Sequence, residues 1–281
     1  MSECIVTFGS SQHLVGTLST PQQLEHNRVG FILLNAGVIS RMGPRRFNVK
    51  LARHLGQIGY CSLRFDLTGQ GDSGHAAQSS PYEKQTSIDL QAAMDQMTLS
   101  TGITRFVIAG ICSGAVAGFK VAQDDPRVVG LWMMDGHVYG TVKSRWMRYR
   151  MQLRHAFVST MRSWLCRFWK KATPESKQRS DRLKTDNPSP TREQFAVALQ
   201  KLVDRNVKIL MMYSSDMLWQ YSYQNQFRDT FKAYGFVDVI ACEYMPQADH
   251  TLTTLANQAH VMTRIGAWAQ VAHPALPDGK V

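Results

Sequence analysis

Two candidate nucleophiles stand side by side where an apolar run gives way to a helix-like one. The stretch "FVIAGICSGAVAGF" (residues 106–119) carries the pattern Gly-Ile-Cys-Ser-Gly at 110–114. A strand that ends in this pattern and turns at once into a helix forces its central residue into a strained conformation, and the glycines make room for the turn. We therefore expect Cys112 to be the nucleophile and the backbone N–H of Ser113 to point into an oxyanion hole. The alternative is a buried structural cysteine.

A nucleophile of this kind needs a general base, and the base needs an acid that orients it. Asp216 stands just past the end of the apolar run "VKILMMYS", and His250 stands just past the last such run. Chain order and placement at strand ends favour Cys112, Asp216 and His250 as a triad. Asp135, at the end of the strand after the elbow, is the reserve candidate for the acid. Asp216 could instead cap a helix.

A second oxyanion donor is expected in the loop after the first long parallel strand, within "LLNAGVISRMGPRRF". Small residues there let the backbone approach a substrate carbonyl oxygen. We favour the N–H of Gly37, and its neighbours Ala36 and Val38 remain open alternatives.

Further residues are expected to contact the substrate. Arg45, with Arg46 beside it, could hold a carboxylate or phosphate, although a solvated first helical turn explains both equally well. His137 in "MMDGHVYG" lies near the expected site, with a structural role as its alternative. Val38 and Trp146 complete the predicted substrate-binding set.

Short apolar runs alternate with helix-like stretches, which indicates an α/β fold with a mostly parallel central sheet and helices on both faces. The first twenty residues predict a β-hairpin at one edge. The predicted strands are 29–35, 60–66, 104–110, 128–135, 207–214 and 237–245, and the predicted helices are 45–58, 83–99, 113–123, 219–234 and 255–270.

The alternation breaks at 140–205, so we divide the chain into a first core part (1–139), a helical cap (140–205) and a second core part (206–281).

The predicted cap carries the charge of the chain. Fourteen Lys and Arg stand against three acidic residues between 141 and 192, an excess equal to the +11 of the whole chain. One apolar stripe at helical spacing runs through this basic segment, with the members Trp146, Tyr149, Leu153, Phe157, Met161, Trp164 and Phe168. A second cap helix is expected in "TREQFAVALQKLVDRN", with a Thr/Glu start signal. A basic block in an otherwise neutral chain predicts one face that meets an acidic partner.

The remaining composition excludes several classes. No uncharged apolar stretch is long enough for a membrane-spanning helix, and the N-terminus lacks the features of a secretory signal. The five cysteines are scattered without the paired spacings of a zinc site, so we expect free thiols, a cytoplasmic protein, no metal and no cofactor. The pattern G-x-G-x-x-G at 69–74 lacks the helix that a dinucleotide fingerprint requires.

The chain resembles α/β-hydrolases of the serine-aminopeptidase-like (S33-type) group, and within it the bacterial hydrolases associated with exosortase and exopolysaccharide gene clusters. The resemblance rests on residues 33–74, on "GICSGA" (110–115) and on "ADHT" (248–251). It implies a covalent acyl-enzyme mechanism with the triad given above, and it places 69–74 in a turn where Asp66 is a buried structural acid. The chain departs from the common pattern in having cysteine as the nucleophile and Asn-Ala in place of the usual His-Gly oxyanion signature.

A cysteine nucleophile favours ester and thioester chemistry, because an acyl-cysteine is itself a thioester. We expect a thioesterase or acyltransferase with an acyl-cysteine intermediate. The acyl substrate could be delivered by an acidic acyl carrier protein or CoA, and the basic cap could contact a membrane surface. Nucleic acid is not expected, since no binding module accompanies the charge. The alternative function is a non-catalytic protein of the same fold that binds an acyl or anionic ligand through its cap.

Overall fold

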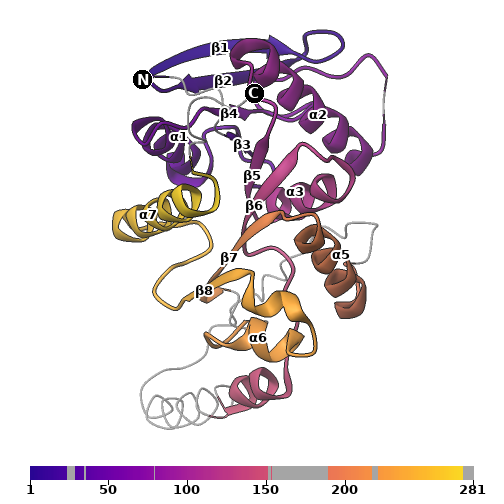
Figure 1. Cartoon of the computed structure of the whole chain (residues 1–281), viewed down its shortest axis with the longest axis vertical. Helices are drawn as coiled ribbons and strands as arrows, with labels where there is room; N and C mark the ends of the chain where they lie inside the picture. Colours follow the sequence, from indigo (N-terminus) through magenta and orange to yellow (C-terminus); the bar gives the residue numbers. More distant parts are fainter. Residues whose placement is uncertain are drawn as a thin grey trace, which may run out of the picture.

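The computed structural model describes residues 1–23, 29–34, 36–78, 80–150, 153, 189–216 and 221–274. Most of the predicted cap, including its apolar stripe from Phe157 to Phe168, lies outside the described residues. The described part contains an eight-stranded sheet in the order β1-β2-β4-β3-β5-β6-β7-β8 (Figure 1). The strands are β1 (Ser2–Phe8), β2 (Leu14–Thr20), β3 (Gly30–Leu33), β4 (Ser62–Phe65), β5 (Phe106–Ile111), β6 (Val128–Met134), β7 (Lys208–Ser214) and β8 (Ala241–Met245).

The pairing confirms the predicted fold class. The hairpin β1–β2 is antiparallel and adds to β4 in antiparallel sense, whereas all pairs from β4 to β8 are parallel. Parallel strands place all their carboxyl ends at one edge of the sheet, and the loops that follow them meet there. This edge, which we call the carboxyl edge, is where residues 36–43, Cys112, Asp135, Ser215 and His250 emerge.

Helices cover both faces of the sheet, and each face has its own apolar core. On one face lie α1 (Phe47–Gln57) and α7 (Leu255–Ala272), and on the other α2 (Tyr82–Thr101), α3 (Ser113–Asp124) and α5 (Arg192–Asp204) (Figure 1). Alternate residues of β5 divide between the two cores: Phe106 and Ile108 pack with α2 and α3, and Val107 and Ala109 pack on the side of α1 and α7. Burial on both faces explains why β5 is apolar throughout rather than alternating.

The region around 219–245 differs from the sequence-based expectation. From residue 221 onward, where this region is described, the helix is α6 (Gln226–Phe231), followed by a 3₁₀ turn at Gly235–Asp238 and then the shortened strand β8. Tyr221 accounts for the late helix start: its buried ring stacks on Tyr213 with centroids 3.9 Å apart. Its hydroxyl accepts the N–H of Phe227 at 3.1 Å, so it satisfies a free donor at the start of α6.

The start of α5 follows the predicted second cap helix with one change of partner. Thr191 is its N-cap, and its hydroxyl accepts the N–H of Gln194. The Gln194 side chain accepts the Thr191 N–H at 2.9 Å in return, which completes a capping box. The start signal is therefore Thr with Gln three positions later, and not Thr with Glu193.

Candidate active site

Cys112 is the single residue between β5 and α3, and its backbone is strained. Its φ of 55° and ψ of −117° lie in a region that non-glycine residues rarely adopt. A Cβ on Gly110 would lie 2.4 Å from the carbonyl carbon of Gly114, so only glycine fits there. The N–H of Cys112 donates to the carbonyl of Met134 at the end of β6, at 2.8 Å. This strained turn has the geometry expected of a nucleophile elbow, with the side chain half-buried at the carboxyl edge.

His250 lies between Cys112 and a buried carboxylate. Its Nδ1 is 2.7 Å from Oδ2 of Asp135, and its ring also hydrogen bonds with the Cys112 thiol. The Asp135 side chain is fully buried, directly after β6, in a left-handed conformation with φ 51°. Ser214 donates to it twice, from its N–H at 2.7 Å and from its hydroxyl at 2.6 Å. These donors hold Asp135 as the acceptor that orients the imidazole.

Asp216 lies at the same edge, but its carboxylate does not bond with the His250 ring. Its Oδ2 accepts the backbone N–H of His250 at 2.8 Å, and the side chain is exposed. The sequence favours Asp216 as the acid that pairs with His250, and the observed contacts correct this choice. The reserve candidate, Asp135, is the acid hydrogen bonded with the imidazole. Asp135 follows its strand without a gap, whereas Asp216 stands one residue further out and reaches only the backbone of the histidine loop.

The contacts at His250 favour a charged pair. The hydrogen bonds with Asp135 and then with Cys112 are the largest causes that raise the pKa of His250 to about 10. The hydrogen bond with His250 is also the largest influence on Cys112 and lowers the pKa of its thiol, although burial acts in the opposite direction. Both shifts therefore act in the same direction, toward a thiolate beside an imidazolium, and a thiolate is the nucleophilic form of a cysteine.

The other described cysteines contrast with Cys112. Cys61 and Cys242 have pKa values raised by burial to about 12, and the Cys242 thiol lies 3.5 Å from the Tyr221 hydroxyl inside the core. Cys4 is exposed on the edge strand. The pKa is thus lowered at Cys112, on the elbow, and raised at the buried Cys61 and Cys242.

The two backbone N–H groups expected to form an oxyanion hole lie close to Cys112. The N–H of Ser113, at the start of α3, hydrogen bonds with the Cys112 sulfur and contributes to the lowering of its pKa. The N–H of Gly37 donates to the Ser113 hydroxyl at 2.7 Å, so the loop after β3 reaches the elbow. Gly37 has φ 59°, and nothing lies within 4 Å of where its Cβ would be. The N–H groups of Ser113 and Gly37 thus lie at the same turn. That of Gly37 is already hydrogen bonded with the neutral hydroxyl of Ser113.

The predicted substrate-binding residues have varied environments. Val38 is exposed beside Gly37, and Arg45 is exposed before α1 with φ 51°. Trp146 is exposed on a helix over 142–150, where the Arg150 guanidinium stacks on its ring at 4.6 Å. His137 has a packing role instead: its ring lies 5.7 Å from that of Phe119 and 5.0 Å from that of Phe195. Burial lowers the pKa of His137 to about 4, so the ring is neutral.

The glycine-rich stretch 69–74 forms turns around Asp66. No helix opens within it, and α2 begins only at Tyr82. The buried Asp66 carboxylate accepts the N–H of Asp72 at 3.1 Å and pairs with the Arg41 guanidinium. A Cβ on Gly71 would lie 2.4 Å from the Asp66 carboxyl carbon, so this glycine is required by the turn. Asp66 therefore holds the loop after β3 next to the loop after β4.

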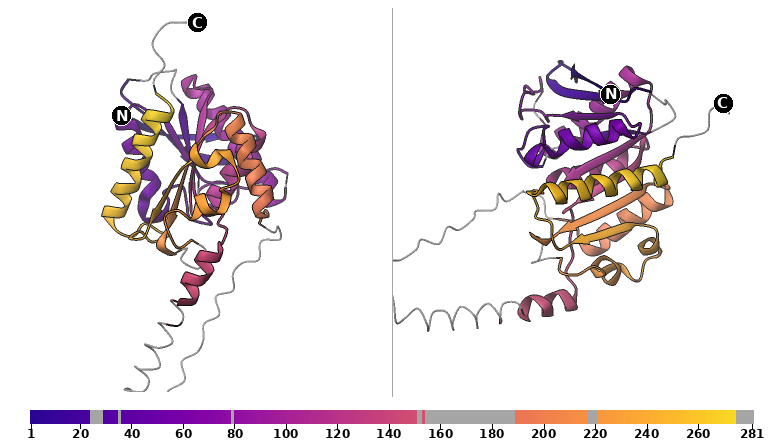
Figure 2. Two further views of the ribbon diagram at one scale, coloured as in Figure 1. Left: turned by 60° about the horizontal axis from the view of Figure 1, so that its bottom comes forward. Right: turned by 90° about the vertical axis from the view of Figure 1, so that its left-hand side faces the viewer.

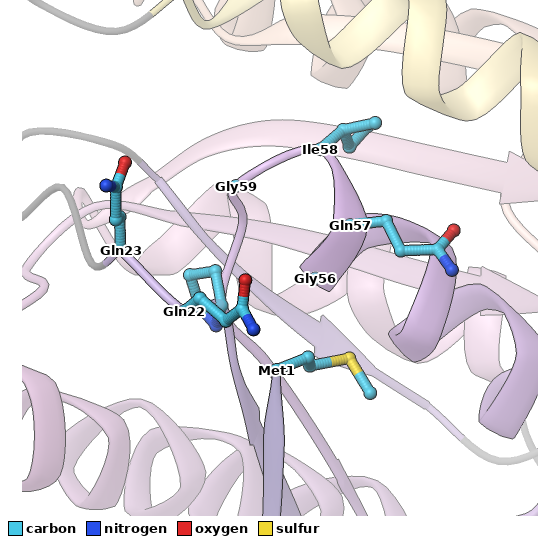
Figure 3. Close-up of a pocket in the computed structure, with 8 residues that line it drawn as sticks. Met1, Gln22, Gln23, Gly56, Gln57, Ile58 and Gly59 are labelled. Atoms are coloured by element: carbon cyan, nitrogen blue, oxygen red, sulfur yellow. The ribbon is translucent and has the colours of Figure 1, made fainter.

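An open hollow of about 810 Å³ lies elsewhere, between the end of β2 and the turn after α1 (Figure 3). It is lined by Met1, Pro21, Gln22, Gln23, Gly56, Gln57, Ile58 and Gly59. These residues adjoin the amino ends of the parallel strands, so the hollow is at the opposite edge from Cys112 and plays no part in this site.

Comparison with known proteins identifies the family. The family model for the alpha/beta hydrolase fold matches residues 31–254, so the chain belongs to the α/β-hydrolase fold family. No curated protein sequence matches the chain.

Solved structures support the fold at low sequence identity. An α/β serine hydrolase without a lid from Xanthomonas campestris matches with a TM-score of 0.58 and 12% identity, over 99% of this chain and 98% of that one. An esterase from Pyrococcus furiosus matches with a TM-score of 0.58 and 14% identity, over 96% and 91%. A dienelactone hydrolase from Anabaena variabilis matches with a TM-score of 0.53 and 14% identity, over 97% and 98%.

Within the described ranges, no group of three or more His, Cys, Asp or Glu side chains is arranged to hold a metal ion. The helices of the same ranges include none with the length and apolar character needed to cross a bilayer.

Proposed function

We propose that this protein is a cysteine-dependent hydrolase or acyltransferase that acts on an ester or thioester through an acyl-cysteine. The observation that carries the proposal is the position of His250, hydrogen bonded with the Cys112 thiol on one side and with the buried Asp135 on the other. Three groups in this order form a nucleophile, a base and an orienting acid. The family includes many activities, so the reaction is argued from the site and not from the fold.

In the proposed first step, the Cys112 thiolate attacks the acyl carbon, and the carbonyl electrons move to oxygen. The resulting oxyanion accepts hydrogen bonds from the N–H groups of Ser113 and Gly37, after displacing the Ser113 hydroxyl from the latter. Each such donor is worth about 3 kcal/mol in hydrolases of known mechanism. When the intermediate collapses, His250 gives its proton to the departing alcohol or thiol, which leaves Cys112 acylated.

In the second step, water or another acceptor gives a proton to His250 and attacks the acyl-cysteine. The carbon–sulfur bond breaks, and Cys112 leaves as a thiolate beside the recharged imidazolium. Asp135 keeps its charge throughout and stabilises the imidazolium, held in place by Ser214. Whether water or a second nucleophile completes the reaction decides between thioesterase and acyltransferase.

The test is intact-mass analysis after brief incubation with short and long acyl thioesters, on the wild type, Cys112→Ala and His250→Ala. We expect an adduct of acyl mass on Cys112 in the wild type, or thioester consumption that both variants abolish. If no thioester or oxyester gives an adduct or turnover, the proposed catalytic function is overturned. Such a result would support the alternative, a binding protein of this fold whose ligand affinity is unchanged in Cys112→Ala.

A further inference from the structure

A helix over residues 142–150 leaves the body of the protein after β6 (Figures 1 and 2). Thr141 caps it, since its Oγ1 accepts the N–H of Ser144 at 3.0 Å and the Ser144 hydroxyl accepts the N–H of Thr141 at 2.9 Å. The Thr141 hydroxyl also bonds with Tyr223 at 2.9 Å. The ring of Tyr223 lies 4.3 Å below the Lys143 ammonium. The first turn is thus tied to the segment before α6, and the rest projects away from the sheet in both views of Figure 2.

One face of this helix is apolar and lacks cover within the described residues. Positions separated by four, three and four fall on the same side of a helix. The four side chains at these positions are exposed, with fractions of 76% for Val142, 56% for Trp146, 60% for Tyr149 and 51% for Leu153. Large apolar side chains gathered on one exposed face indicate a binding surface, unlike isolated ones.

Basic side chains border this apolar face. On a helical projection, Lys143 and Arg150 fall on one side of the stripe and Arg145 on the other. Residues 142–150 contain four basic side chains and no acidic one. Long Lys and Arg side chains beside a Trp/Tyr stripe suit the interface of a bilayer, where the aromatic rings enter the headgroup layer and the charges reach the phosphates.

We propose that this face, formed by Val142, Trp146, Tyr149 and Leu153, docks the protein on an anionic lipid bilayer. An acidic carrier protein would use the charges, but a continuous apolar stripe of this kind is better matched by a lipid surface, which supplies both negative charge and an apolar layer. The proposal commits to the bilayer because it accounts for both features.

A second exposed apolar group emerges at the same edge of the sheet. Val38, Ile39 and Met42 are exposed in the loop after β3, next to the Gly37 donor. The strands β3 and β6 run parallel on either side of β5, so this loop and the 142–150 helix both follow carboxyl ends. Docking by this edge would bring Cys112 toward an acyl group held in the bilayer. That last step rests on the proposed function, whereas membrane binding itself does not.

The experiment measures co-sedimentation of the full chain with vesicles of phosphatidylcholine alone or with about 30% phosphatidylglycerol in about 0.1 M salt. It uses the Cys112→Ala variant as background, so the result is independent of turnover. We expect binding to the anionic vesicles only, and a loss of roughly tenfold or more in affinity for the Trp146→Ser/Tyr149→Ser variant. The matched control is Leu99→Ser/Val271→Ser, since these side chains are also exposed, on α2 and α7, and it should bind like the parent.

Charge is tested separately with Arg145→Gln, which should weaken binding by about fivefold, against Arg192→Gln on α5, which should not. Melting temperatures and circular dichroism of all variants report folding. Equal binding to neutral and anionic vesicles, no binding to either, or equal losses in the control variants would each overturn the proposal. Binding to an acidic protein without binding to vesicles would overturn it in favour of a protein partner. Failure here leaves thioester turnover in solution untouched, so it is distinguishable from failure of the proposed function.

Discussion

Replacing Asp135 by asparagine tests the pairing at His250 most directly. In Asp135→Asn, the amide oxygen can still accept the N–H of Ser214, but the NH₂ group then faces Nδ1 of His250. Donation to Nδ1 fixes the proton of a neutral imidazole on Nε2, the tautomer that cannot take a proton from Cys112. The substitution therefore removes both the charge that stabilises the imidazolium and the correct tautomer.

The structure sets a scale for this effect. The pKa of His250 is about 10 against an ordinary 6.5, and Asp135 is the larger of the two hydrogen-bonded causes. Loss of Asp135 therefore brings the pKa of His250 down toward its ordinary value and lowers the population of the ion pair. The tautomer effect adds to this, so we expect kcat/KM to fall by roughly 10² to 10⁴.

The assay is thioester turnover for Asp135→Asn beside Asp216→Asn, with melting temperatures for both. The amide oxygen introduced by Asp216→Asn can still accept the backbone N–H of His250, so this variant should stay within about threefold of the wild type. If Asp216→Asn lost as much activity as Asp135→Asn, or more, the reasoning from the observed contacts would be refuted and the order inferred from the sequence would stand.

Three further changes have defined outcomes. The rate of alkylation of Cys112 by iodoacetamide should rise at lower pH than that of an ordinary thiol, because its pKa is lowered. In His250→Gln the rise should move up toward the ordinary value of about 9, and an unchanged profile would contradict the ion pair. Gly110→Ala should lower the free energy of unfolding by roughly 2 kcal/mol or more, because the new Cβ would lie 2.4 Å from backbone atoms of Gly114. Urea titration measures this, and an unchanged stability would contradict the elbow geometry. Ser113→Ala frees the N–H of Gly37 from a neutral hydrogen bond worth about 1 kcal/mol, so kcat/KM should rise about fivefold, and a fall would assign the hydroxyl a supporting role.

The sequence predicts the sheet and the elbow well because both depend on local rules. Near-continuous apolar runs specify strands buried on two faces, and the glycine at 110 leaves room that no other residue would. The late start of α6 was not predicted, since it depends on Tyr221 stacking on Tyr213 from a distant strand. Contacts of this kind are set by the tertiary fold and leave no periodic signal.

The acid shows the same limit within the site. Asp135 and Asp216 both follow strands of one parallel sheet, so the sequence brings both to the carboxyl edge and cannot separate them by chain order alone. What distinguishes them is burial and the donors of Ser214, which require the pairing of β6 with β7. A signal was present: a serine at the end of β7 is a polar residue in a buried run, and a buried hydroxyl needs a partner.

In the proposed mechanism, the two aspartates have separate tasks. A buried carboxylate with three hydrogen bonds can stabilise an imidazolium without rearranging. An exposed carboxylate is screened by water and stabilises the imidazolium charge little. Asp216 is better suited to fix the loop that presents His250, through one backbone N–H. Its removal in Asp216→Ala would thus act on the position of the ring and leave the charge of the imidazolium in place, which separates a positioning acid from an electrostatic one.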